Sequence, residues 1–151
     1  MTVSHRLRTE FGDADDSTGL MLWRVTNTWQ AAQRRVLKPF GITHVQFVLL
    51  ASLTWLDGDA PVTQQALARH AGTDPMMTSQ VLRALESAGL IDRGAHPSDG
   101  RAKLLRVTAA GRELANRAIG AVEACDRAFF DTLDGDRADF TRMLSRLARS
   151  S

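Results

Sequence analysis

The chain has little cysteine, and the other features that it lacks exclude several classes of protein. Cys125 is the only cysteine among the 151 residues, so no disulfide bond can form within one chain, as is typical of proteins from a reducing compartment. No apolar run approaches the ~18 residues that span a bilayer, and the acidic N-terminus does not resemble a signal peptide. We therefore expect a cytoplasmic protein without a membrane segment.

Patterns typical of enzymes and metal sites are also missing. The four histidines are scattered, with no pair four residues apart and no cysteine beside them, so no zinc-binding spacing is present. The sequence has neither a glycine loop that cradles phosphate nor a nucleophile elbow. We expect no catalytic residue, no bound metal and no cofactor.

Composition and length predict one folded domain. The sequence is 44% hydrophobic and 24% charged, which is close to the average of globular proteins, and 151 residues are enough for one buried core. We find no internal repeat and no low-complexity tract. Residues 1–16 are polar and without periodicity, so we expect a flexible arm followed by a single domain over residues 17–151.

The formal net charge of +2 is small, but the charge is unevenly distributed. Residues 1–16 contain two arginines and four acidic residues, whereas residues 60–110 contain six basic and four acidic residues. A mildly basic segment suits a phosphate-bearing partner such as nucleic acid, although the same balance occurs in proteins that bind none.

The pattern before residue 60 predicts two helices. Apolar residues recur every three or four positions from Ser17, which indicates a long amphipathic helix that ends before Pro39. Thr43 and Gln46 form a capping-box pattern ahead of a second apolar run. We therefore expect a second helix from Thr43 to about Asp57.

Residues 61–88 predict a helix-turn-helix. Thr63 has a side-chain oxygen that can cap a short helix, and Gly72 is suited to end it. Asp74 and Pro75 then begin a second helix, because proline at the first helical position lacks only an N–H that would be unpaired anyway. The polar residues that follow lie on the N-terminal surface of this second helix.

A β-wing and two more helices are predicted after the helix-turn-helix. Gly89 is suited to end the preceding helix, and two strand-like stretches, 90–93 and 101–107, flank a cluster of turn-forming residues. Thr108 can cap another long helix, which is followed by a final short one. We predict a fold that is mainly α with a small β-wing, of the α+β class: a winged helix-turn-helix between N-terminal and C-terminal helices.

Four sequence fragments occur in an order and spacing that are strongly specific together. They are Gly41-Ile42-Thr43 followed by Gln46-Phe47, residues 85–91 with Arg93, Asp99-Gly100-Arg101, and Val107-Thr108-Ala109-Ala110-Gly111. With these fragments the chain resembles the MarR (multiple antibiotic resistance regulator) family of winged-helix transcription factors over about residues 17–149. The resemblance implies a DNA-binding core at about 43–108 and dimerisation helices at about 17–39 and 109–149.

The second helix of the helix-turn-helix carries residue types that read bases. A helix fits the major groove, where each base pair shows a distinct set of groups, so Gln80 can pair with adenine and Arg83 with guanine or a phosphate. Met76 or Thr78 can contact a thymine methyl group. The alternative for these side chains is a solvated helix face.

The first helix and the wing supply further candidate contacts. The N-terminus of the first helix suits phosphate contacts or simple capping. The resemblance places Arg101 at a wing tip that enters the minor groove, and we infer that Asp99 orients Arg93 or Arg101; the alternative is an ordinary charged hairpin tip. The candidate DNA-binding residues are Thr63, Gln64, Gln65, Pro75, Met76, Thr78, Ser79, Gln80, Arg83, Arg93, Asp99, Arg101 and Lys103.

These features predict a transcriptional repressor that binds a specific sequence in double-stranded DNA. The alternative is a winged-helix module that binds other proteins, as in assembly factors. A net positive charge with Gln80, Arg83 and Arg101 on one surface argues against that alternative.

The outer helices provide material for a homodimer. One recognition helix makes too few base contacts for genomic selectivity, so we expect a two-fold dimer on a palindromic operator with half-sites about one DNA turn apart. Small residues in the long C-terminal helix allow close approach of a partner helix; the alternative is packing within one chain. The candidate dimerisation residues are Leu22, Val25, Leu114, Ala118, Ala121, Cys125, Phe140, Leu144 and Leu147.

The resemblance also implies a small aromatic effector that loosens DNA binding. The side chains that could line its pocket are Trp23, Trp29, His44, Phe47 and Trp55, whose common alternative is the hydrophobic core. Cys125 as a redox switch is a weaker hypothesis, because no second cysteine is available within the chain.

Overall fold

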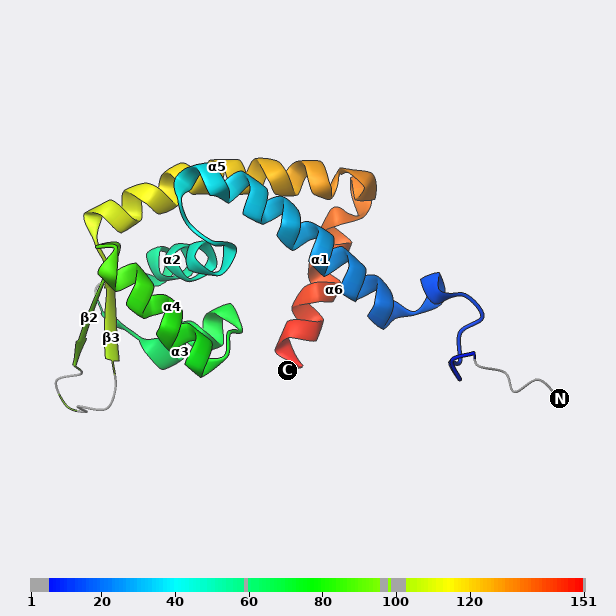
Figure 1. Cartoon of the computed structure of the whole chain (residues 1–151), viewed down its shortest axis with the longest axis horizontal. Helices are drawn as coiled ribbons and strands as arrows, with labels where there is room; N and C mark the ends of the chain where they lie inside the picture. The colour runs from blue at the N-terminus through cyan, green and yellow to red at the C-terminus, as the bar shows by residue number, and fades with distance from the viewer. Residues whose placement is uncertain (1–5, 59, 96–97, 99–102, 151) are drawn as a thin grey trace.

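The computed structural model describes residues 6–58, 60–95, 98 and 103–150, and it confirms the predicted fold class. In Figure 1, α2, α3, α4 and a small sheet form one lobe beneath the first half of α5. Helix α1 lies beside α5 and extends away from this lobe, and α6 turns back below the far end of α5. The elements are η1 (Ala14–Asp16), α1 (Thr18–Leu37), η2 (Lys38–Phe40), α2 (His44–Leu56), β1 (Val62–Thr63), α3 (Gln64–Ala71), α4 (Pro75–Ser87), β2 (Ile91–Ala95), β3 (Lys103–Val107), α5 (Ala109–Phe129), η3 (Asp131–Asp136) and α6 (Arg137–Arg149).

Side-chain caps begin the helices where the sequence predicts them. Ser17 accepts a hydrogen bond from the backbone of α1, and Thr43 forms a reciprocal capping box with Gln46 at the start of α2. Asp74 caps α4 directly ahead of Pro75. Each cap satisfies amides that would otherwise have no partner, so local chemistry fixes where these helices start.

The corner between α1 and α2 brings the two helices together. Gly41 has φ 72°, a left-handed conformation that favours glycine, and it follows the short helix η2. In the described part of the chain, no single helix is both long and apolar enough to cross a membrane; α1 with η2 and α2 meet both requirements only together, as a pair bent by 77°. Four apolar residues of α2 are buried inside the protein: Phe47, Leu49, Leu50 and Leu53.

The sheet contains one strand that the sequence analysis missed. Strands β2 and β3 form the predicted antiparallel pair, with Ile91 opposite Val107. The short strand β1 adds to the other edge of β3, so the order is β1-β3-β2. Because β1 leads straight into α3, this pairing fixes the start of the helix-turn-helix against the wing.

Two buried clusters hold the elements together. The larger one joins α2, α3, α4, the sheet and the start of α5, and includes Leu67, Leu82, Leu85 and Leu105. The smaller one joins the end of α1 to α2 and the middle of α5: Leu37, Phe47, Ala118 and Val122. The lobe formed by α2, α3, α4 and the sheet is therefore packed against the long helices α1 and α5.

The structure corrects two of the predicted dimerisation residues. Leu114 belongs to the larger cluster and Ala118 to the smaller one, and both side chains are buried within the chain. They lie on the face of α5 that packs against α1 and α2. A seam of small apolar residues is compatible with packing inside one chain as well as between two chains, and here the internal helices occupy it.

Candidate nucleic-acid interface

The N-terminal half of α4 presents an exposed face. Met76 is 72% exposed and Met77 is 39% exposed, and Pro75, Gln80 and Arg83 are exposed as well. Leu82 and Leu85, on the opposite face, are buried in the core, which fixes the orientation of the helix. The structure thus leaves most of the predicted base-reading side chains available to a partner.

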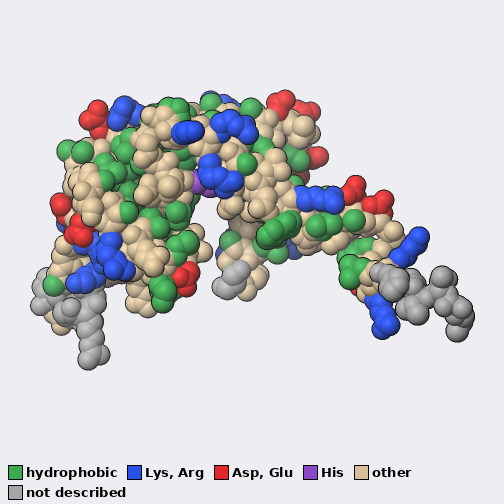
Figure 2. All heavy atoms as spheres, in the orientation of Figure 1, with side chains coloured by type: hydrophobic (Ala, Val, Ile, Leu, Met, Phe, Trp, Pro, Cys, Tyr) green, Lys and Arg blue, Asp and Glu red, His purple; other side chains and the backbone are tan. Residues whose placement is uncertain are grey.

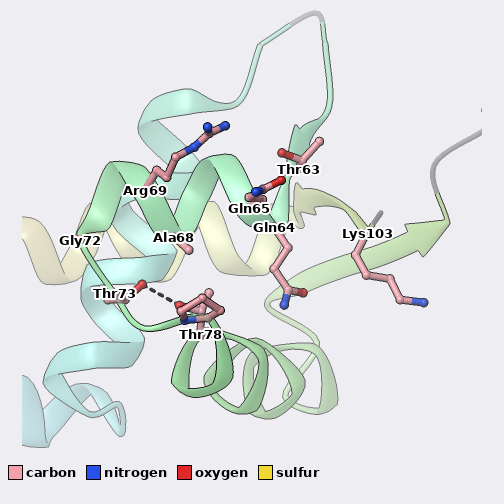
Figure 3. Close-up of a pocket in the computed structure, with 10 residues that line it drawn as sticks. Thr63, Gln64, Gln65, Ala68, Arg69, Gly72, Thr73, Thr78 and Lys103 are labelled. Carbon is pink, nitrogen blue, oxygen red and sulfur yellow. Dashed lines mark hydrogen bonds between the residues drawn. The ribbon is translucent and has the colours of Figure 1, made fainter. Parts of the chain in front are cut away.

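Thr78 does not lie on this face, so its predicted contact with thymine is wrong. Its side chain is fully buried, and its Oγ1 donates to the carbonyl oxygen of Asp74 at 2.7 Å. Its hydroxyl proton is then committed, so the Thr73 hydroxyl is the donor in the 2.6 Å contact between the two Oγ1 atoms, drawn as a dashed line in Figure 3. Thr78 therefore holds the turn between α3 and α4. A threonine in a helix commonly bonds back to a carbonyl four residues earlier, and that signal was available in the sequence.

A hollow of about 670 Å³ lies between α3, the start of α4 and β3. It gathers six predicted DNA-binding residues from separate elements, and no acidic side chain is among the described residues that line it. Figure 3 shows the lining residues on α3, on the turn between α3 and α4, and on β3. The lining residues are Thr63, Gln64, Gln65, Ala68, Arg69, Gly72, Thr73, Pro75, Thr78 and Lys103.

Arg69 lines the hollow and was missed in the sequence analysis. It is exposed and lies four residues after Gln65, on the same face of α3. With Lys103 on β3, it places a second positive charge at the hollow. The helical spacing from Gln65 could have identified it, because residues four apart on a helix are neighbours.

Arg93 links the wing to the start of α3. Its Nη2 donates to Oε1 of Gln64 at 3.1 Å, while its buried Nε makes no hydrogen bond among the described residues. The contact orients the Gln64 side chain toward the hollow's rim. The predicted contacts Asp99 and Arg101 lie outside the described residues.

The five residues predicted to form an effector pocket do not line one cavity, which corrects that expectation. Trp23 and Trp55 are 68% and 84% exposed on different helices, and Phe47 is buried in the core. Only Trp29 and His44 meet, with ring centroids 5.0 Å apart in an edge-to-face arrangement.

A polar network surrounds the Trp29–His44 pair. Trp29 Nε1 and Gln33 Nε2 both donate to Oδ1 of Asp126, at 2.8 and 2.7 Å, and so join α1 to α5. Gln33 is fully buried, yet its Oε1 has no hydrogen-bond partner among the described residues. A buried acceptor without a donor is costly, so this site favours a ligand or water that donates a hydrogen bond.

Burial lowers the pKa of His44 below its usual 6.5, and the positive charge of Arg34 acts in the same direction. Asp126 opposes both effects by favouring the charged imidazole. Since the shift is downward, His44 is neutral near pH 7, and its ring can contact an uncharged aromatic group.

The free energy of unfolding should fall as the pH drops below about 6.5. The unfolded chain protonates His44 near the ordinary pKa, whereas the folded protein keeps it neutral to a lower pH, so the unfolded state binds more protons between the two values. The contribution of His44 is present above 6.5 and is lost as the pH falls through the folded-state pKa. Urea denaturation from about pH 7.5 to about pH 5 should show a shallower decline for His44→Gln than for the original chain. Identical declines would contradict this assignment.

Apolar side chains remain exposed on the outer helices. Leu22 and Val25 on α1 and Leu144 and Leu147 on α6 are exposed, as a dimer surface requires, and Met143 is a further exposed residue on α6. Figure 2 shows hydrophobic side chains along the part of α1 that extends from the main body. Three other candidates are partly buried: Ala121, Cys125 and Phe140.

Comparison with known proteins identifies the family. The model of the MarR family matches residues 42–103. The chain is also 41% identical over 122 residues to the HTH-type transcriptional regulator YdcH of Bacillus subtilis, which covers 80% of this chain and 83% of that protein. The chain belongs to the MarR family.

Other MarR-type proteins support the same assignment over a longer span. The chain is 38% identical over 138 residues to the HTH-type transcriptional repressor Rv2887 of Mycobacterium tuberculosis, covering 90% of this chain and 97% of that protein. Crystal structures of Rv2887 with DNA and with salicylic acid superimpose with TM-scores of 0.64 and 0.67, at 33% and 36% identity, covering 87% and 89% of this chain and 97% and 99% of those chains. A MarR family regulator from Rhodococcus sp. RHA1 superimposes with a TM-score of 0.83 at 26% identity, covering 93% of this chain and 99% of that one.

Proposed function

We propose that this protein is a homodimeric transcriptional repressor that binds a palindromic operator and is released by a small aromatic acid. The observation that carries the proposal is the exposed N-terminal face of α4 beside a hollow that contains Arg69 and Lys103 and is free of acidic residues among the described ones. The relative Rv2887, a repressor crystallised with DNA and with salicylic acid, supports both halves of the proposal.

In the proposed complex, α4 enters the major groove. Met76 and Gln80 face the base edges, where an apolar side chain suits a thymine methyl and an amide suits adenine. The sugar-phosphate backbone of the DNA passes the hollow, where Arg69, Lys103 and the first amides of α3 contact phosphates. Thr78 and Arg93 hold the turn and the Gln64 side chain in position rather than reading bases.

The proposed dimer joins the outer helices of two chains. It thereby sets the distance between the two reading heads, each of which consists of α3, α4 and the wing of one chain. The exposed residues of α1 and α6, led by Leu22, Val25 and Leu147, provide its apolar surface. We retain residues 43–108 as the reading core and residues 17–39 and 109–149 as the dimerisation region. Since α5 begins in the core and ends beside α1, a change in its angle would alter the spacing of the heads.

The proposed effector site is the corner between α1, α2 and α5. Trp29 and His44 offer an aromatic surface, Arg34 supplies positive charge near His44, and Gln33 Oε1 is a buried acceptor. An aromatic acid with a hydroxyl donor matches these groups in aromatic character, charge and hydrogen bonding. A ligand here would separate α1 from α5 near the Asp126 network and so change the head spacing.

Selection of bound duplexes from a random pool tests the function. We expect the full chain to select a palindrome with half-sites about one DNA turn apart, because a two-fold dimer presents two α4 helices. Salicylate should then weaken binding to that duplex and raise the melting temperature of the free protein. Selection of no common sequence at low and at moderate salt would contradict DNA reading.

Replacing Arg83 with alanine should distinguish base reading from phosphate contact. Arg83 is exposed, and its Nε lies 3.4 Å from the carbonyl oxygen of Ser79. If Arg83 contacts guanine, the variant should lose about 1–3 kcal/mol of binding free energy and should discriminate less between bases at one operator position. If Arg83 contacts a phosphate, binding to all duplexes should weaken, and the slope of log affinity against log salt concentration should decrease by about one. Fluorescence anisotropy over a salt series measures both. Arg117→Ala on α5 is the control. If Arg83→Ala bound with the affinity and the salt dependence of the original chain, Arg83 would not contact DNA.

A further inference from the structure

Two adjacent methionines occupy the tip of the proposed reading helix. Met76 and Met77 are the second and third residues of α4, directly after Pro75. Met76 is 72% exposed and Met77 is 39% exposed, so both residues present surface to solvent, Met76 far more than Met77. The backbone beneath them is fixed, since the amide of Met77 donates to the Asp74 carboxylate at 2.9 Å.

These thioethers are better placed for oxidation than the cysteine. Cys125 is partly buried in α5, outside the hollow and the exposed face of α4. Methionine oxidation converts a flexible apolar side chain into a polar sulfoxide, and exposure favours the reaction. A sulfoxide at position 76 would place an oxygen and a strong dipole where an apolar contact with a base is proposed.

We propose that Met76 and Met77 form an oxidation site through which hypochlorous acid or a similar two-electron oxidant releases the protein from DNA. The proposal rests on the function proposed above and adds a second signal to it, independent of an aromatic effector. The modification acts at the DNA-reading face itself, so it requires no change in the angle of α5 or in the dimer.

The reaction balances with the oxidant alone. The sulfur lone pair attacks the chlorine of hypochlorous acid, the O–Cl bond breaks and hydroxide leaves. Water then adds its oxygen to sulfur, two protons are lost and chloride departs, which leaves the sulfoxide. Each thioether loses two electrons and each hypochlorous acid is reduced to chloride; the net products are sulfoxide, chloride and one proton.

Oxidation should weaken DNA binding without unfolding the protein. Because neither side chain belongs to the two buried clusters, their conversion leaves the packing of the core in place. The loss falls on the apolar contact that Met76 makes with a base, so we expect about tenfold or greater loss of affinity for the selected duplex. Enzymatic reduction by methionine sulfoxide reductases A and B together should restore binding, since each enzyme acts on one sulfoxide epimer.

The experiment measures duplex affinity of the full chain before oxidation, after limited hypochlorous acid and after enzymatic reduction. A Cys125→Ser background removes thiol chemistry, and mass spectrometry locates the sulfoxides. The test variant is Met76→Leu with Met77→Leu, which keeps apolar side chains; the matched control is Met143→Leu on α6, whose methionine is 55% exposed but lies outside the reading face.

Each variant is compared with its own affinity before oxidant. We expect oxidant to leave the double variant's own starting affinity unchanged, whatever that affinity is, whereas Met143→Leu should lose affinity by the same factor as the parent. Equal losses in the double variant and the parent would overturn the proposal, as would full affinity of a parent shown to carry both sulfoxides. If recovery failed after sulfoxides were removed, the loss would come from other damage and the proposal would fall. Absence of specific binding before any oxidant is added would instead refute the underlying function.

Discussion

Replacing Gly111 with alanine should destabilise the protein by about 3 kcal/mol or more, a large share of the stability of an ordinary domain. A Cβ at this position would lie 2.0 Å from the carbonyl oxygen of Leu90 and 3.0 Å from Cγ2 of Val107. The Leu90 oxygen belongs to the backbone and also accepts from the amide of Thr108 at 3.1 Å, so it cannot move aside alone. Gly111 thus permits α5 to start against the junction of α4 and β2.

Gly120→Ala is the matched control within the same helix. Beyond its chain neighbours and the adjoining backbone of α5, no atom of the described residues lies within 4 Å of the position that its Cβ would take. Alanine should therefore stabilise α5 by about 0.5–1 kcal/mol through its higher helix propensity. Urea denaturation followed by tryptophan fluorescence and circular dichroism measures both variants. A Gly111→Ala protein as stable as the original chain would show that the contact between α5 and Leu90 is not rigid.

The helix boundaries could be predicted because they depend on local chemistry. Ser17, Thr43, Asp74 and Thr108 each cap the helix that the sequence assigns to them, and Gly72 ends α3 in a left-handed conformation. Strand β1 was missed because two residues give no periodic signal; Val62 and Thr63 form a strand only through pairing with distant β3.

Burial was harder to predict, because it depends on which neighbours the fold supplies. Thr78 and Gln80 both read as polar residues of a recognition helix, yet the loop residue Thr73 covers the first and leaves the second exposed. The three tryptophans likewise lie on predicted helices, but Trp29 is the one with a ring contact to α2 and a hydrogen bond to α5 among the described residues. Spacing identifies the helix face; the packing of separate elements decides whether that face is a core, a site or a surface.

One charged contact that no sequence motif indicated joins three elements beneath the wing. Asp57, directly after α2, has a side chain only 9% exposed. Its Oδ1 accepts from Arg106 on β3 at 3.3 Å, and its Oδ2 accepts from Arg112 in the first turns of α5 at 2.8 Å. Arg106 also donates to the carbonyl oxygen of Gly58 at 3.0 Å. The carboxylate therefore fixes the angle of β3 relative to the body of the reading lobe.

Asp57→Asn should lower the free energy of unfolding by about 1–3 kcal/mol and weaken duplex binding as well. Asparagine keeps the shape but removes the charge that compensates two guanidinium groups near the positive end of α5. The carboxylate is nearly buried while both arginine side chains are about half exposed, so solvent screens part of the loss. Binding should weaken because β3 carries Lys103 and leads from the wing. Glu113→Gln is the control: its pair with Arg117 is exposed and 4.0 Å long, so its removal should change stability by less than about 0.5 kcal/mol. Urea denaturation and anisotropy on the same preparations separate the two effects, since folded Asp57→Asn protein with undiminished affinity would show that the wing keeps its position without this carboxylate.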